Sequence, residues 1–190
     1  MRIGCPKEIK AQECRVGLTP AGVDALVRAG HEVYMEDNAG LLSGFPNEEY
    51  VAQGAKILPT AKEVYDIADM IVKVKEPEKC EWDMLRPGQI LYTYLHLAAC
   101  KELAEKLMEK QVKAVAFETI TDEQGNLPCL RPMSQVAGRL SIQEGAKYLE
   151  RSFGGRGLLL GGVPGVERGK IAIIGAGIAG TYAAKAAVGM

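Results

Sequence analysis

The chain has 190 residues and a nearly balanced charge, with 23 lysines and arginines against 24 aspartates and glutamates. A hydrophobic content of 47% is enough to bury a core, so the composition excludes a disordered chain and indicates a globular protein. The balanced charge gives no reason to expect nucleic acid or an anionic membrane as a partner. Small molecules and other subunits remain as the expected partners.

The apolar stretches and the cysteines of the sequence indicate the cellular compartment in which the protein is expected. No stretch offers the roughly twenty unbroken apolar residues of a membrane span, and the first six residues lack the features of a secretory signal. Five cysteines without any CxxC pair fit reduced thiols better than a disulfide framework. The two histidines, His31 and His96, lie far apart in sequence, so no metal site is expected. These features predict a cytoplasmic protein.

Short apolar runs alternate with helical patterns over the first 120 residues. The first helix is well delimited, because Thr19 can cap it, Pro20 suits its first position and Gly30 follows its end. Strands separated by helices of this length indicate right-handed crossovers, and therefore a doubly wound parallel sheet of the α/β class. We expect strands over residues 2–5, 31–35, 56–58, 70–75, 89–96 and 113–118, and helices over residues 20–29, 48–53, 61–67 and 101–110.

The rest of the chain predicts a connection and the start of a second domain. A turn at residues 122–126 precedes a longer helical pattern over residues 134–151. The following segment, 154–169, is rich in glycine and contains Pro164, which is typical of a hinge between domains. We therefore expect a catalytic or substrate domain over residues 1–130, a connecting helix and hinge over 131–169, and an incomplete nucleotide-binding domain over 170–190.

A glycine-rich turn lies near the end of the chain, between an expected strand over residues 170–174 and an expected helix over residues 181–188. It has the GxGxxG order of dinucleotide-binding proteins, in which Gly175 permits the turn, Gly177 lets a pyrophosphate approach and Gly180 lets helix pack on strand. The alternative is a plain tight turn. One strand and one helix cannot form a sheet, so we expect the fold to be incomplete.

Charged residues close three of the expected strands or follow them. Ligands of open parallel sheets bind beyond the carboxyl ends of the strands, so these positions are candidates for a binding site. Lys73 and Lys75 share one face and either could turn into a cleft, with Lys75 favoured because it comes last. His96 ends an apolar strand and has a side chain suited to proton transfer near neutral pH. A solvated lysine and an ordinary core or surface histidine are the alternatives.

Arg15 follows the first expected strand, where a guanidinium could bind a carboxylate with both of its arms. A surface arginine paired with Glu13 or Glu8 is the other interpretation. His31 follows a glycine that ends a helix and is expected to be a surface turn residue.

Together these residues resemble the alanine dehydrogenase family along the whole chain. The resemblance lies in several motifs, which are Arg2-Ile3-Gly4-Cys5-Pro6-Lys7-Glu8, Arg15-Val16-Gly17-Leu18-Thr19-Pro20, Val72-Lys73-Val74-Lys75-Glu76-Pro77, Tyr94-Leu95-His96-Leu97-Ala98, residues 132–139 and residues 160–166. It implies reversible, NAD-dependent conversion of L-alanine to pyruvate and ammonium by a homohexamer. Family members are about twice as long, with C-terminal helices that fold back onto the first domain.

The resemblance also implies roles for individual residues. Arg15 and Lys75 would bind the substrate, His96 would be the acid and base, and Ser134, Gly175, Gly177, Ile178 and Gly180 would contact NAD. For Ser134 the alternative is a helix cap. Two other functions stay open: the soluble NAD-binding subunit of a proton-translocating transhydrogenase, which should lack this histidine, and a fragment that binds a small amino or keto acid without turning it over.

Overall fold

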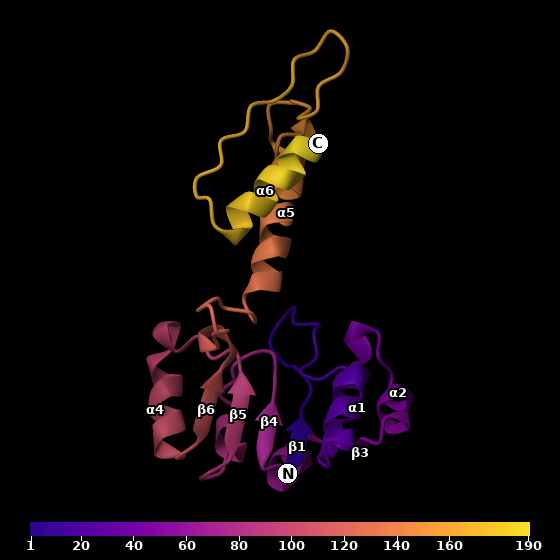
Figure 1. Ribbon diagram of the computed structural model, residues 1–190, viewed down its shortest axis with the longest axis vertical. Helices are drawn as coiled ribbons and strands as arrows, with labels where there is room; N and C mark the ends of the chain where they lie inside the picture. Colours follow the sequence, from indigo (N-terminus) through magenta and orange to yellow (C-terminus); the bar gives the residue numbers. More distant parts are fainter. The chain divides into compact units, whose positions relative to one another are not determined.

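A computed structural model describes residues 1–190 and shows two compact units, Met1–Thr119 and Ile120–Met190 (Figure 1). The first unit carries a six-stranded sheet, and the second consists of two long helices with irregular segments between them. No helix in either unit is both long enough and apolar enough to cross a membrane.

Six short strands form one sheet, in which every neighbouring pair is parallel. Their order in the sheet is β3-β2-β1-β4-β5-β6, so the chain builds outward from β1 to one edge and then from β4 to the other. The predicted doubly wound α/β class is confirmed. The strands are β1 (Arg2–Cys5), β2 (Glu32–Glu36), β3 (Lys56–Leu58), β4 (Met70–Val72), β5 (Ile90–Thr93) and β6 (Lys113–Ala116).

Helices connect the strands, as the alternating sequence pattern predicts. Thr19 caps the first helix by accepting a hydrogen bond from the Gly22 N–H at 3.2 Å, and Thr60 caps the third by accepting from the Glu63 N–H at 3.3 Å. The helices of this unit are α1 (Pro20–Arg28), α2 (Asn47–Ala52), α3 (Ala61–Ile67) and α4 (Lys101–Glu109), with short 3-10 turns η1 (Leu41–Ser43), η2 (Trp82–Met84), η3 (Leu97–Ala99) and η4 (Phe117–Thr119).

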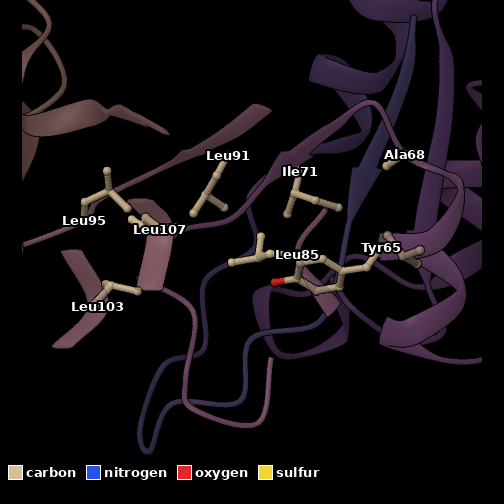
Figure 2. Close-up of a cluster of buried hydrophobic side chains, with 9 residues drawn as sticks. Tyr65, Ala68, Ile71, Leu85, Leu91, Leu95, Leu103 and Leu107 are labelled. Atoms are coloured by element: carbon tan, nitrogen blue, oxygen red, sulfur yellow. The ribbon is translucent and has the colours of Figure 1, made fainter. Parts of the chain in front are cut away.

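Two apolar clusters hold the helices against opposite faces of the sheet. One joins α3, η2 and α4 to the central strands through Ile71 and Leu91 (Figure 2). The other joins α1 and α2 to strands β1 and β2 through Cys5 and Met35. Gly4, which pairs with Ile71, and Cys5, which pairs with Met35, are consecutive in one strand, so the two clusters lie on different faces.

One part of the sheet stays uncovered within the first unit. Helix α1 packs on one face of the sheet at its β1 and β2 end. Over strands β4 to β6 the same face carries Tyr92 and Val115, and Val115 is 42% exposed. An apolar groove of about 360 Å³ runs beside α1 on this face and is lined by Val72, Tyr92 and Phe117, among others. Parallel sheets are normally covered on both faces, so this face is an unsatisfied apolar surface of residues 1–119.

Three strands end earlier than the sequence predicts, and at two of them a glutamate side chain accepts the next backbone N–H groups. The strand expected over residues 70–75 ends at Val72, since the Glu8 carboxylate accepts from the N–H groups of Val74 at 2.6 Å and Lys75 at 3.4 Å. The strand expected over residues 89–96 ends at Thr93, and the Glu118 carboxylate binds the next free N–H groups. The strand expected over residues 113–118 ends at Ala116, where η4 begins.

The second unit is built on α5 (Arg131–Tyr148), η5 (Arg151–Phe153) and α6 (Ile178–Gly189). The two long helices touch closely at Gly138, where an added Cβ atom would come within 2.2 Å of the Ala179 carbonyl oxygen. The predicted turn over residues 122–126 is present, with the Asp122 N–H donating to the Asn126 carbonyl at 2.9 Å.

The strand predicted over residues 170–174 is wrong for this structure, in which the segment is irregular. A strand needs a neighbour for its backbone groups, and residues 120–190 contain no second strand for it to pair with. Its side chains are correspondingly exposed, Ile174 fully and Ile171 to 40%. This end of the chain therefore presents an exposed apolar surface.

A buried hydroxyl offers a test of this core. Thr93 is fully buried, and its Oγ1 atom has no hydrogen-bond partner. Replacing it by the isosteric valine removes an unsatisfied polar group, so we expect Thr93→Val to raise the free energy of unfolding by up to about 1 kcal/mol. Urea denaturation of the 190-residue chain measures the change. The control is Thr19→Val, which removes a helix cap and should lower the same quantity by about 1 kcal/mol. A loss of stability in Thr93→Val as large as in Thr19→Val would contradict the assignment.

Candidate functional site

The sheet reverses its direction of growth between β1 and β4, which are neighbours although β2, β3 and the helices α1, α2 and α3 separate them in sequence. In open parallel sheets, ligands bind at the carboxyl ends of the strands beside such a reversal. Arg15 lies in the loop after β1, Lys75 follows β4, and His96 follows β5, the next strand. The topology therefore brings the three predicted residues to one edge of the sheet.

Gly17 allows the loop after β1 to lie directly on β4. A Cβ atom added at Gly17 would stand 2.7 Å from the Val72 carbonyl oxygen and 3.1 Å from the Lys73 Cα atom. Any side chain here would push the loop away from the strand. This contact holds the segment that carries Arg15 against the strand that leads into Lys75.

Lys73 and Lys75, which the sequence left as alternatives, have different environments. The Lys73 side chain is 1% exposed, and its Nζ atom lies 2.9 Å from Glu81 Oε1 and 3.7 Å from Glu8 Oε2. Lys75 is half-buried. Lys73 is therefore enclosed as part of the protein's own charge network, whereas Lys75 remains as the lysine that can meet a ligand.

The two carboxylates around Lys73 also bind backbone. Glu8 accepts from the Val74 and Lys75 N–H groups, and Glu81 accepts from the Glu78 N–H at 2.8 Å and the Tyr65 hydroxyl at 3.1 Å. Burial raises the pKa of Glu8, although the charge of Lys73 and the two backbone N–H groups oppose that rise. The Glu8 carboxylate therefore holds the backbone of Lys75, and the ionisation of Glu8 depends in turn on the charge of Lys73.

Arg15 is paired with Glu13, the interpretation that the sequence left open. The Glu13 carboxylate accepts from Arg15 Nε at 2.8 Å and Nη2 at 2.6 Å, and this hydrogen bonding lowers the pKa of Glu13 to about 2. The charge of Lys75 acts on the same carboxylate and lowers its pKa further. The hydrogen bond that Arg15 donates to Glu13 is the largest cause that raises the pKa of Arg15, and Tyr94, two residues before His96, raises it further. Lys75 and Tyr94 therefore act electrostatically on the Arg15–Glu13 pair.

His96 has an unusual backbone conformation that two N–H groups stabilise. Its φ is 50°, in the left-handed region, and its N–H donates to Glu118 Oε1 at 2.7 Å. The Leu95 N–H donates to the same carboxylate at 3.1 Å. Burial acts to raise the pKa of Glu118, but the Glu118 backbone N–H, the N–H groups of His96 and Leu95 and the charge of His96 together lower it. A hollow of about 420 Å³ opens beside the ring, lined by His96, Glu118 and η3 among others.

The glycine turn of the second unit combines tight backbone packing with open space at the start of a helix. Gly175 has a φ of 103°, which only glycine adopts readily, and a Cβ atom at Gly180 would lie 2.0 Å from the Gly175 carbonyl oxygen. Space above Gly177 is open, with no heavy atom within 4 Å of an added Cβ atom. α6 begins at Ile178, and no side chain caps it, so its first N–H groups are available to an anion.

Ser134 lies inside the first turn of α5, because the helix starts at Arg131 rather than at Ser134 as predicted. Its N–H donates to the Leu130 carbonyl at 3.1 Å, as in an ordinary helical turn. The alternative interpretation, in which Ser134 caps the helix, is therefore wrong. Ser134 stays a candidate for cofactor contact.

Several glutamates around the site were missed in the sequence. Glu76, Glu81 and Glu118 follow or lie near strand ends, where reasoning from the sequence weighed only cations and histidine. Glu8 was considered only as a partner of Arg15. The sequence did contain a signal for these glutamates. Backbone N–H groups beyond the end of a buried strand need an acceptor, and a glutamate near that end can supply it.

The comparisons with known proteins cover the chain completely. The family model described as Alanine dehydrogenase/PNT, N-terminal domain, matches residues 4–137, and the one described as Alanine dehydrogenase/PNT, C-terminal domain, matches residues 141–190. All 190 residues align with alanine dehydrogenases of Methanococcus maripaludis and Bacillus subtilis, at 58% and 55% identity. The chain spans 51% and 50% of those proteins, about half the length of the curated relatives it matches.

Two solved structures are similar over nearly the whole chain. An L-alanine dehydrogenase superposes with a TM-score of 0.94 at 54% identity, covering 100% of this chain and 52% of the other. A transhydrogenase from Sinorhizobium meliloti superposes with a TM-score of 0.83 at 26% identity, covering 99% and 56%.

The buried cation gives a sharp prediction. Lys73→Met leaves Glu8 and Glu81 buried without their counter-charge, so we expect a loss of about 3–5 kcal/mol in the free energy of unfolding at neutral pH. Burial already raises the pKa of Glu8 in the folded state, and the loss of Lys73 should raise it further. An ionised Glu8 then opposes folding above that pKa, and protonation relieves the cost as the pH falls through it. The destabilisation should therefore shrink in mild acid.

Chemical denaturation at several pH values checks this expectation. The matched control is Lys56→Met, which removes an exposed lysine from its pair with Glu32 and should change stability little at any pH. Equal effects of the two substitutions would mean that the enclosed ammonium does not balance the buried carboxylates.

Proposed function

Since the chain belongs to the alanine dehydrogenase/PNT family, we propose that it forms the substrate-binding domain and the start of the nucleotide-binding domain of an NAD-dependent alanine dehydrogenase. Such an enzyme interconverts L-alanine with pyruvate and ammonium. The observation that carries the proposal is the gathering of Arg15, Lys75 and His96 at the carboxyl edge of the sheet, beside the reversal between β1 and β4.

Each of the three side chains suits one part of the substrate. The Arg15 guanidinium would bind the carboxylate, in competition with Glu13. Lys75 would donate to the oxygen of the carbonyl or carbinolamine and stabilise the charge that develops there. His96 would remove a proton as the amino acid is oxidised and return it in the reverse direction.

The glycine turn fits a dinucleotide. Gly175, Gly177, Ile178 and Gly180 would hold the pyrophosphate of NAD against the first N–H groups of α6, and Ser134 would contact the same cofactor. When bound, the nicotinamide supplies the acceptor for the hydride that leaves the α-carbon. The residues of this chain then bind, orient and exchange protons with the substrate.

Transhydrogenase is the second candidate, because one such structure superposes on nearly the whole chain. The identity of 26% to that structure against 54% to the L-alanine dehydrogenase favours the deaminating enzyme. His96 favours it too, since imine chemistry needs an acid and base while hydride exchange between nucleotides does not. A binding fragment without turnover is the third candidate and requires that residues 1–190 act alone.

The remaining features of the proposal follow the family resemblance. We propose a cytoplasmic homo-oligomer, which the family resemblance implies to be a hexamer. We also propose a substrate domain over residues 1–130, a connection over 131–169 and the start of the NAD domain over 170–190. Residues 170–174 would become a strand when further strands of that domain pair with it.

Catalysis by His96 is tested in a polypeptide that extends residues 1–190 to the length of the relatives. His96→Ala should lower kcat for L-alanine oxidation by about 10²- to 10⁴-fold, because it removes the acid and base, as followed by NADH absorbance. His31→Ala is the control, since His31 lies at the start of β2, and should leave kcat unchanged. Unchanged kcat in His96→Ala would exclude the proposed role.

The glycine turn makes a separate prediction. Gly177→Ala should fold normally, since its φ is −70° and an added Cβ atom meets nothing within 4 Å. The same methyl group would stand where the pyrophosphate approaches, so the Kd for NAD should rise at least about tenfold, equivalent to about 1.4 kcal/mol. Calorimetric titration of the extended polypeptide measures it. Gly189→Ala, at the far end of α6, should bind NAD normally, and equal affinity of both variants would refute phosphate binding at this turn.

A further inference from the structure

Glu76 lies between a lysine and the histidine of the proposed site. Its Oε1 atom accepts from the Lys10 ammonium group, and its Oε2 atom lies 3.2 Å from His96 Nδ1. The Glu76 side chain is 17% exposed, while that of His96 is 49% exposed. Both carboxylate oxygens therefore have one defined partner each.

The sheet order explains why these three residues meet. Lys10 follows β1, Glu76 follows β4 and His96 follows β5, and these strands lie side by side in the order β1-β4-β5. Glu76 thus occupies the middle position and reaches a neighbour on either side. The contact is a product of the same topology that gathers the proposed substrate-binding residues.

Lys10 favours the ionised form of Glu76. Burial by itself would raise the pKa of Glu76, but the hydrogen bond and charge of Lys10, the Glu76 backbone N–H and the charge of His96 together lower it. Glu76 is therefore a carboxylate at neutral pH. A carboxylate can only accept hydrogen bonds, so the proton in its contact with the ring must belong to His96 Nδ1.

The backbone and the ring of His96 are controlled by different carboxylates. Glu118 binds the N–H groups of Leu95 and His96 and fixes the left-handed turn. Glu76 is the hydrogen-bond partner of the imidazole, and the Tyr94 ring lies 6.3 Å from it between centroids. The orientation of the ring therefore depends on Glu76, and the path of the chain on Glu118.

We propose that Glu76 is a positioning residue that holds His96 as the Nδ1–H tautomer, so that Nε2 presents its lone pair to the substrate. This inference rests on the proposed role of His96 and deepens it. In a free histidine side chain the Nε2–H tautomer predominates, and its Nε2 atom has no lone pair to accept a proton. Lys10, which keeps Glu76 ionised, extends the arrangement to a line of three side chains.

The tautomer can be read directly from ring nitrogen shifts. The probe is the 190-residue chain labelled with ¹⁵N, recorded by long-range ¹H–¹⁵N correlation above the usual histidine pKa of about 6.5. The chain has two histidines, so His31→Gln assigns the signals. We expect the His96 Nδ1 atom to carry the proton. A wild-type ring in the Nε2–H form would overturn the proposal without any variant.

Glu76→Gln should change this spectrum. The amide can donate to Nδ1, so the ring should shift toward the Nε2–H form, while the backbone amide spectrum shows that the fold persists. Glu78→Gln removes the same charge two residues away and should keep the Nδ1–H form. A His96 spectrum that is unchanged in Glu76→Gln, or changed equally in both variants, would overturn the proposal.

Activity of the extended polypeptide separates this inference from the proposed function. Glu76→Gln should lower kcat on the order of 10²-fold with little change in the KM for L-alanine, because proton transfer is lost while substrate contacts remain. Unchanged kcat in Glu76→Gln, with an active parent, would overturn the positioning role. An inactive parent with an Nδ1–H ring would overturn the proposed function and leave the ring assignment supported.

Discussion

The ammonium group of Lys73 is enclosed between the carboxylates of Glu8 and Glu81, and much of the candidate site depends on this arrangement. A charge this deeply buried is tolerated only with close counter-charges whose remaining oxygens also find donors. Here those donors are the N–H groups of Val74 and Lys75 on one side and of Glu78 on the other. The charge balance in the interior therefore determines the path of the chain that carries Lys75 to the surface.

A common feature of the sheet is that glutamates terminate its central strands. The Lys73 N–H still bonds to the Tyr92 carbonyl of β5 at 3.1 Å, but β1 has already ended at Cys5, and the Glu8 side chain accepts the next N–H group, that of Val74. Glu118 does the same after β5, and Glu36 accepts from the Lys7 N–H after β1 at 2.7 Å. Carboxylates thus accept the backbone N–H groups at the points where these strands end and the proposed site begins. They also place negative charge around the positively charged side chains of that site.

Predictions from the sequence succeeded where the chemistry behind them is local and failed where it depends on residues distant in sequence. Apolar periodicity and helix caps depend on local chemistry, so the parallel class and the helix starting after Thr19 could be predicted. The ends of the strands at Val72 and Thr93 could not, because they depend on glutamates distant in sequence. Arg15 was ambiguous for a different reason, since Glu13 is close in sequence but only the folded loop reveals that the two side chains pair. The strand over residues 170–174 failed because its apolar pattern is local while strand pairing is not.

The two parts of the proposed enzyme are prepared for their ligands to different degrees. Around His96 the ring and the backbone already have hydrogen-bond partners, so the orientation of the proposed acid and base is fixed without a ligand. Around Gly177 the turn is formed and the N–H groups of α6 are free, but the preceding segment has no strand to pair with. The turn needs only local backbone geometry, whereas the depth and walls of a dinucleotide site need a whole sheet. The residues of the proposed proton transfer therefore lie within residues 1–119, whereas the proposed hydride transfer would require more of the nucleotide-binding fold than one turn and one helix.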